Sequence, residues 1–183
     1  MAYSRHWDRC LDNLAGRAGR WVETRWPLVL AATWGGLLLL AAAAPLSWAA
    51  GLYPLAARLY WLFHFICHQE PARSLWIAGH PMAICARDVG LYGGLWVGVL
   101  MALWRRPSLP GWLVVMCVLP MALDGGTQLL GLRESTNVLR LVTGGLAGIP
   151  TAAYLGSVIA RRGASSAVPP ASAPFMGERT DGQ

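Results

Sequence analysis

Four apolar runs, each about 20 residues long, constrain the fold of this chain more than any other feature. They cover residues 27–46, 84–104, 111–132 and 138–160. Each run is long enough to cross a bilayer as a helix. Hydrophobic residues make up 55% of the chain and charged residues 13%, a balance typical of membrane proteins. The sequence therefore predicts an all-α polytopic membrane protein with four transmembrane helices in a lipid bilayer.

A further apolar stretch, residues 52–68, is rich in aromatic residues but short, and it contains Arg58. We expect it to form a short interfacial or re-entrant helix on the outer side of the membrane. If it crossed the membrane instead, the chain would have five spans. Arg105 and Arg106 would then lie opposite the N-terminal arginines, which is less consistent with the usual distribution of basic residues.

The distribution of arginine predicts the orientation of the chain. The net charge of +6 comes from arginine, because the chain contains no lysine. Five arginines precede the first run, and arginine pairs follow the second and fourth runs. The positive-inside rule then places both termini in the cytoplasm, with the chain as a multi-pass protein of a bacterial or archaeal cell (inner) membrane. Because these charges gather at helix ends and form no basic stripe, we expect no nucleic-acid partner.

The predicted domain organisation has three parts. Residues 1–26 form a cytoplasmic basic segment, either an amphipathic helix on the membrane surface or a solvated tail. Residues 27–160 form the membrane domain. Residues 161–183 are rich in Ala, Ser, Pro and Gly and are expected to be a disordered cytoplasmic tail. The apolar side of the N-terminal helix would consist of Trp7, Leu11, Leu14 and Trp21.

Glycines repeat every four residues on two of the predicted spans. The second span carries Gly90, Gly94 and Gly98, and the fourth carries Gly144 and Gly148. Small residues at this spacing let two helix backbones approach closely. The short links between the last three spans predict antiparallel neighbours.

A cluster of thiols, imidazoles and a carboxylate lies between the first two spans and at the start of the second. The pool of possible metal ligands is Cys67, His68, His80, Cys85 and Asp88. These residue types match a tetrahedral site for zinc or another transition metal. His64, Cys67 and His68 have the spacing i, i+3, i+4, so one helix face could present all three.

Two other arrangements of the thiols remain open. Cys67 and Cys85 could form a structural disulfide, since the predicted location is outside the cytoplasm, where disulfides persist. They could also be free buried thiols. Cys117 lies in the middle of the third span and is expected to be an ordinary small apolar residue.

A second group of polar residues lies on the third and fourth spans and their link. Its members, with Arg87 from the second span, form a predicted polar pocket: Asp124, Gln128, Arg133, Asn137 and Arg140. Asp124 lies inside an apolar run and needs a partner, for which Arg87 and Arg140 are expected. One interpretation is an inter-helix ion pair that fixes packing. The other joins this group to the thiol cluster in one outward-facing pocket. There arginines would hold a phosphate or carboxylate, and Asp88 and Asp124 would hold a metal or act as a general base.

These residues resemble a known family, the small predicted membrane proteins grouped as domain of unknown function 2085. The resemblance rests first on Cys67, His68, Gln69, Pro71, Arg73 and Ser74. It continues through Gly79, His80, Pro81, Met82, Cys85, Ala86, Arg87, Asp88, Gly90 and Tyr92. It ends with Asp124, Gly125, Gln128, Arg133, Ser135, Asn137, Arg140, Thr143 and Gly144. It covers roughly residues 58–150 and implies a membrane location and a site at these residues.

The resembled family usually has Cys-Ala-Arg-Cys where this chain has Cys85-Ala86-Arg87-Asp88. A carboxylate is a harder ligand than a thiolate and favours a different ion. The family implies no particular reaction.

Three functions follow from the sequence. The leading one is a metal-binding membrane protein with the thiol cluster as its site. The alternative is a structural or accessory subunit of a larger membrane complex, with other membrane protein subunits as partners. The third is a membrane enzyme acting on a lipid-linked anionic substrate. No complete nucleophile–base set and no phosphate loop is present in the sequence, so whether the chain is an enzyme stays open.

Overall fold

A computed structural model describes the backbone of residues 2–105 and 108–166 and the side chains of residues 25–104, 108–159 and 161. Helices dominate this part of the chain. The element order is α1 (Ala2–Ala49), α2 (Tyr53–His64), a short 3₁₀ turn (Pro71–Arg73), β1 (Ser74–Ile77), β2 (His80–Cys85), α3 (Ala86–Arg105), α4 (Gly111–Leu129) and α5 (Asn137–Ser166).

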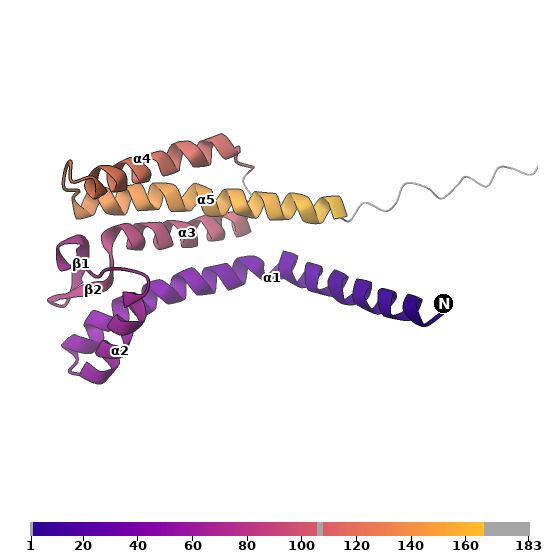
Figure 1. Cartoon of the computed structure of the whole chain (residues 1–183), viewed down its shortest axis with the longest axis horizontal. Coiled ribbons are helices and arrows are strands. Elements are labelled where there is room, and N and C mark those ends of the chain that lie inside the picture. The colour runs from indigo at the N-terminus through magenta and orange to yellow at the C-terminus, as the bar shows by residue number, and fades with distance from the viewer. Residues whose placement is uncertain (1, 106–107, 167–183) are drawn as a thin grey trace, which may run out of the picture.

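Helix α5 is the centre of a layer in which α3 and α4 lie on either side of it (Figure 1). The C-terminal part of α1 runs along α3, and α2 folds back beside α1. The β1–β2 hairpin sits at the end of the bundle where α1 ends and α3 and α5 begin. The loop after α2, the hairpin and the starts of α3 and α5 therefore lie at one end of the molecule.

Among the described residues, three segments are long and apolar enough to cross a membrane: Arg25–Ala49, Gly111–Leu129 and Asn137–Ile159. They correspond to the first, third and fourth predicted spans. The predicted second span forms helix α3, but α3 does not reach the same apolarity, so the four-span prediction is not confirmed. Arg87 and Asp88 in its first turn and the glycines along it lower its hydrophobicity.

The three apolar segments differ in how much of each lies inside the protein. Only 6% of the most apolar window of α4 is buried, compared with 50% for α5. An apolar helix with so little buried surface in a membrane protein presents its side chains to lipid, which is as apolar as a protein core. Helix α5 is thus internal to the bundle, and α4 is peripheral.

The predicted glycine contacts are confirmed between α3 and α5. A side chain at Gly94 would place its Cβ atom 2.7 Å from the carbonyl oxygen of Gly145. Gly90 and Gly98 meet the α5 backbone in the same way, and Gly144 and Gly148 meet the α3 backbone. Since backbone atoms cannot move aside, these positions need glycine for the two helices to pack at this distance.

Helix α2 has 12 residues, a length of about 18 Å, which is too short to cross a hydrocarbon core of about 30 Å. The short helix expected within residues 52–68 is therefore present, and it does not add a fifth span. It ends at His64, so Cys67 and His68 lie beyond it. The expectation that His64, Cys67 and His68 share one helix face is wrong.

The segment between the two cysteines forms a β-hairpin, which the sequence analysis did not predict. Ile77 pairs with His80, and the two residues between them, Ala78 and Gly79, have φ angles of 51° and 80°. Positive φ at both central positions is the mark of a type I′ hairpin turn. Strand β2 includes Ile84 and Cys85, so the helix begins at Ala86 and not at the predicted residue 84.

Apolar side chains from three elements hold the hairpin against the helices. The buried members of this core are Ala41, Ala44, Leu59, Phe63, Cys67, Met82, Ala83 and Ile84. The Tyr60 hydroxyl also donates a 2.5 Å hydrogen bond to the carbonyl of Pro81 in β2. This packing fixes the position of Cys85, because it lies at the end of the same strand.

Helix extends beyond both ends of the predicted membrane domain. Residues 2–25 continue α1 as helix, but the side chains of Trp7, Leu11, Leu14 and Trp21 lie outside those that the structure describes. Helix α5 continues to Ser166, past the predicted end of the membrane domain at residue 160. The remainder of the predicted tail, residues 167–183, lies outside the described residues.

Candidate metal centre

Cys67, Cys85 and Asp88 lie together although they belong to three different segments, and from here on the name thiol cluster refers to these three residues. One ligand atom from each, the two Sγ atoms and a carboxylate oxygen, lies within 4.8 Å of the other two. Cys67 belongs to the loop after α2, Cys85 ends β2, and Asp88 lies in the first turn of α3. Both cysteines are free thiols, so the disulfide alternative is not realised in this structure.

Local backbone geometry brings the three groups together. Gln69 has a left-handed φ of 56°, which is uncommon for a residue other than glycine and reverses the chain after Cys67. Its side-chain amide donates a 2.6 Å hydrogen bond to the carbonyl of Tyr60, which holds this turn on α2. Asp88 lies one helical turn beyond Cys85, and a carboxylate is favoured in the first turn of a helix.

Hydrogen bonds link the three groups directly. The backbone N–H of Cys85 donates to the Cys67 sulfur at 3.3 Å. The Cys85 thiol donates to a carboxylate oxygen of Asp88 at 3.2 Å. Each of these contacts supports negative charge on an atom that could bind a metal.

The two thiols differ in acidity because of their contacts. A hydrogen bond from the Cys85 thiol lowers the pKa of Cys67 to about 7, and backbone N–H groups of Gln69 and Cys85 act in the same direction. The same interaction with Cys67 raises the pKa of Cys85, and burial raises it further. The Cys85 thiol has one proton, which it can donate to Cys67 or to Asp88. Cys67 is therefore the group that forms a thiolate first.

Neither histidine of the predicted ligand pool is part of the close cluster found among the described residues. His68 lines the same cleft as the thiols, but its ring is not part of the close cluster found among the described residues. His80 starts β2 and packs its ring beside Trp48, with a ring-centre distance of 6.0 Å. The structure therefore brings together three of the five residues in the predicted pool.

Asp124 lies at the centre of a buried ion-pair cluster on the same end of the bundle. Its side chain is 2% exposed. Its two oxygens pair with Arg87 at 2.5 Å and with Arg133 at 2.7 Å. Arg87 also donates to Gln128 at 3.2 Å. The prediction that Arg87 would be a partner is confirmed, and the prediction of Arg140 as the second partner is wrong, because Arg133 occupies that side of the carboxylate.

Arg140 instead takes part, through Asn137, in a chain of contacts between α5 and the hairpin. Its guanidinium donates to the Asn137 side-chain oxygen at 2.8 Å, and the Asn137 amide donates to the backbone carbonyl of Ser74 at 3.2 Å. Ser74 in turn pairs with Cys85 across the hairpin. A chain of contacts thus runs from α5 to the strand that carries one of the thiols.

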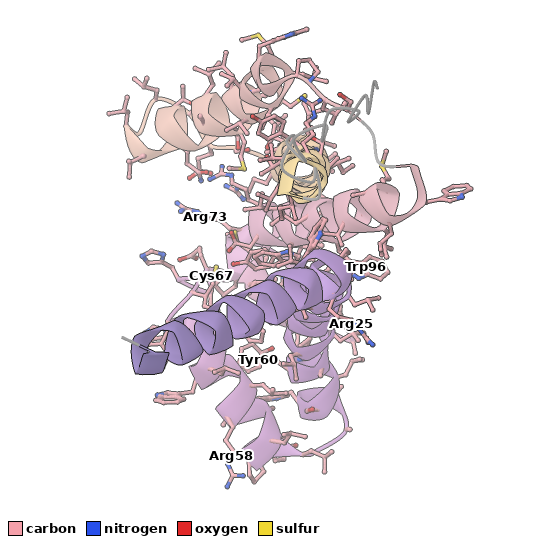
Figure 2. All side chains as sticks on the ribbon, turned by 90° about the vertical axis from the view of Figure 1, so that its right-hand side faces the viewer. Arg25, Arg58, Tyr60, Cys67, Arg73 and Trp96 are labelled. Carbon is pink, nitrogen blue, oxygen red and sulfur yellow. The ribbon has the colours of Figure 1, made fainter. Side chains whose placement is uncertain are left out.

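The thiol cluster and the arginines face one cleft of about 240 Å³. Figure 2 views the side chains along the bundle from the opposite end; in this view Cys67 and Arg73 lie near each other, and Arg58 lies well apart from them on α2. The polar part of the cleft wall consists of Cys67, His68, Gln69, Glu70, Arg73, Cys85, Arg87, Asp88, Gln128 and Arg140. Of the predicted polar pocket, Arg87, Gln128 and Arg140 line this cleft beside the two thiols, whereas Asp124, Arg133 and Asn137 are not among its lining residues.

Four cleft residues were not in the predicted site: Ile66, Gln69, Glu70 and Arg73. Glu70 and Arg73 lie between the cysteines in the segment that forms the 3₁₀ turn. In the sequence, Glu70 and Arg73 closely follow Cys67-His68-Gln69, and this was the signal that could have identified them as site residues. Using that signal required knowing that the segment turns back over the thiols. The hairpin provides this geometry.

The family model described as "Predicted membrane protein (DUF2085)" matches residues 67–154. An uncharacterised protein of the archaeon Methanothermobacter thermautotrophicus is 40% identical over 90 residues, which are 48% of this chain and 81% of that relative. The chain belongs to this family. The resemblance seen in the sequence is confirmed.

The DUF2085 match begins at Cys67 and includes every residue of the thiol cluster and of the ion-pair cluster. A second relative, an uncharacterised protein of Methanocaldococcus jannaschii, is 44% identical over 102 residues, or 53% of this chain and 65% of the relative. The chain thus spans somewhat less than two thirds of the length of that relative. No solved structure matches the chain significantly.

Proposed function

We propose that this member of the DUF2085 family is an integral membrane protein that binds a transition-metal ion, with zinc as the best match. The observation that carries the proposal is the convergence of Cys67, Cys85 and Asp88 within 4.8 Å. Thiolate and carboxylate are both ligands of zinc, with metal–ligand distances of about 2.0–2.3 Å.

Three protein ligands leave a fourth position of a tetrahedral ion open. In zinc proteins this pattern is typical of catalytic sites, where water or substrate occupies the fourth position, whereas structural sites have four protein ligands. The thiol cluster lies on a cleft wall, so water or substrate in the cleft would have access to an open coordination position. His68 and Glu70 line the same cleft and are alternatives to water as a fourth ligand.

The acidity of the thiols also supports the proposal. Metal binding requires thiolates, and Cys67 has a lowered pKa. Cys85, whose pKa is raised, would lose its proton when the ion binds, as coordinated thiols do. Binding should therefore release protons and become stronger as pH rises.

In the bilayer we propose that α3 crosses together with the three apolar segments, and that α2 lies at the outer interface. Helix α3 has 20 residues and lies alongside α5, so it runs through the same layer. Trp61 and Phe65 at the end of α2 are exposed and pack edge to face at 4.9 Å. Aromatic side chains of this kind are enriched at membrane interfaces. The cleft then opens on the extracytoplasmic side, and both termini lie in the cytoplasm.

Metal analysis of the full chain purified in detergent tests the proposal. We expect about one zinc ion per chain after reconstitution and dialysis, and loss of that ion in Cys85→Ser and Asp88→Ala. Cys117→Ser is the matched control, because it removes a thiol from the middle of α4, outside the cluster. If the wild-type chain is folded by circular dichroism and retains no metal, the proposal is wrong.

A further inference from the structure

The cleft that carries the thiol cluster has more guanidinium groups than carboxylates. Arg73, Arg87 and Arg140 line it, together with Glu70 and Asp88. Arg87 shares Asp124 with Arg133, so two positive charges there are balanced by one negative charge. If Asp88 binds a metal ion, its charge is no longer available to the arginines.

Arg140 is the clearest case of a cation that lacks a counter-ion. The residue is 4% exposed, and among the described residues its side chain donates to a neutral amide oxygen, that of Asn137. Its Nε atom is buried without a hydrogen-bond partner, and no described carboxylate lies within 4 Å of its guanidinium. Burying a charge without a paired group is costly, so such a cation usually faces an anion.

Arg87 shows the same feature on the neighbouring helix. One of its terminal nitrogens binds Asp124 and Gln128, while its Nε atom is buried without a partner. Gly125 leaves room for this guanidinium, since a side chain there would place its Cβ atom 3.1 Å from the other terminal nitrogen. Among the described residues, the buried Arg140 and the partly exposed Arg87 therefore line one cavity, and each has an Nε atom without a hydrogen-bond partner.

We propose that the cleft binds a phosphate group, either free phosphate or the phosphate of a lipid headgroup, through Arg73, Arg87 and Arg140. Guanidinium groups bind phosphate through charge-assisted hydrogen bonds, and a phosphate has enough oxygens for three of them. A carboxylate has two oxygens and would satisfy fewer of these donors. A cavity of about 240 Å³ at the end of the bundle has room for such a group.

The phosphate would lie beside the thiol cluster, since Arg87 and Asp88 are adjacent in α3 and line the same cleft. A phosphate oxygen could also bind at the open coordination position of the metal ion. This part of the inference rests on the proposed function, because it requires the metal site. The arginine contacts do not depend on the metal, so the two proposals can fail separately.

Calorimetric titration of inorganic phosphate into the full chain in detergent tests the inference, with metal-free and zinc-loaded protein measured in parallel. We expect saturable binding of about one phosphate per chain in both, with zinc content determined separately. Arg73→Gln should weaken binding about tenfold or more, because it removes a charged donor from the exposed edge of the cleft. Arg140→Gln should have the same direction of effect if it folds.

Arg58→Gln is the matched control, because it removes an exposed arginine from α2, away from the cleft (Figure 2). It should bind phosphate as the wild type does. Competition by a short-chain phosphatidic acid, but not by phosphatidylcholine of the same chain length, would identify a headgroup as the occupant. Lack of competition would identify free phosphate, and both results uphold the inference. Absence of saturable binding of either probe, or unchanged affinity in Arg73→Gln, would overturn it.

Discussion

At the scale of single residues, Asp124 explains why a carboxylate is tolerated in an otherwise apolar helix. The side chain is almost fully buried, and each of its oxygens accepts a hydrogen bond from an arginine. Arg87 comes from α3 and Arg133 from the link to α5, so one carboxylate ties together two neighbouring parts of the bundle. The group stabilises packing and also sets the position of Arg87 in the cleft.

Asp124→Asn should reduce stability by about 3 kcal/mol or more, because it leaves Arg87 and Arg133 without their carboxylate. Chemical unfolding in detergent, followed by circular dichroism, measures this change. Glu134→Gln is a suitable control, since it removes an exposed carboxylate from the neighbouring link. Equal effects of the two substitutions would show that the ion pairs contribute little.

The acidity of Cys67 leads to a second prediction at this scale. In metal-free protein, alkylation of Cys67 by iodoacetamide should rise with pH around a midpoint of about 7, because the thiolate reacts and forms above the pKa. Cys85→Ala removes the hydrogen bond that lowers this pKa, so the midpoint should move to higher pH. Mass spectrometry of the Cys67 peptide over a pH series gives both midpoints. An unchanged midpoint in the variant would contradict the assigned cause.

At the scale of elements, the pairing of α3 with α5 depends on glycine. The four-residue repeats were visible in the sequence, and their role in close packing is confirmed by the contacts of Gly94 and Gly148 with the opposite backbone. This pairing has a functional consequence. It places Arg87 and Asp88, at the start of α3, next to Arg140, at the start of α5.

Gly94→Ala should destabilise the protein by about 1–3 kcal/mol, since the added Cβ would meet the backbone of Gly145 and force the helices apart. Gly93→Ala, one position away on the same helix, has nothing within 4 Å of the new atom. That variant should be neutral or slightly stabilising, because alanine favours helix more than glycine does. Thermal unfolding of both variants in the same detergent is the test, and similar melting temperatures would argue against backbone contact.

The hairpin is the element that the sequence analysis missed, and the reason is local. Its strands have four and six residues, with Gly79 and Pro81 close to the turn, so no alternation of polar and apolar residues marks them. Ala78 occupies a turn position that usually belongs to Asn, Asp or Gly. The strand pairing depends on packing against α1 and α2, which a sequence pattern does not contain.

At the scale of the whole molecule, the proposed function depends on which parts of the chain meet at one end of the bundle. The loop after α2, the hairpin, the start of α3, the end of α4 and the start of α5 all lie at one end (Figure 1). The end of α3 and the start of α4, with residues 108–110 before it, lie at the opposite end. If the bundle crosses a bilayer, the cleft faces one compartment and residues 108–110 face the other.

Labelling of single cysteines in cells tests this arrangement. In a variant with the native cysteines replaced by serine, Ala72→Cys should react with a membrane-impermeant maleimide from outside, because Ala72 is exposed beside the hairpin. Ser108→Cys, exposed in the link after α3, should react only after the membrane is permeabilised. Reaction of both positions from the same side would show that α3 does not cross.

The sequence by itself indicated a family of membrane proteins, four apolar runs of which three form helices apolar enough to cross a bilayer, and glycines that mark a close helix pair. These features follow from composition and spacing within single segments. The tertiary structure decided which residues meet: Asp124 with Arg133 and not Arg140, and Cys67 with Cys85 and Asp88 without His80. Such proximity depends on how distant segments pack, and in this chain an unpredicted hairpin positions one of the three ligands.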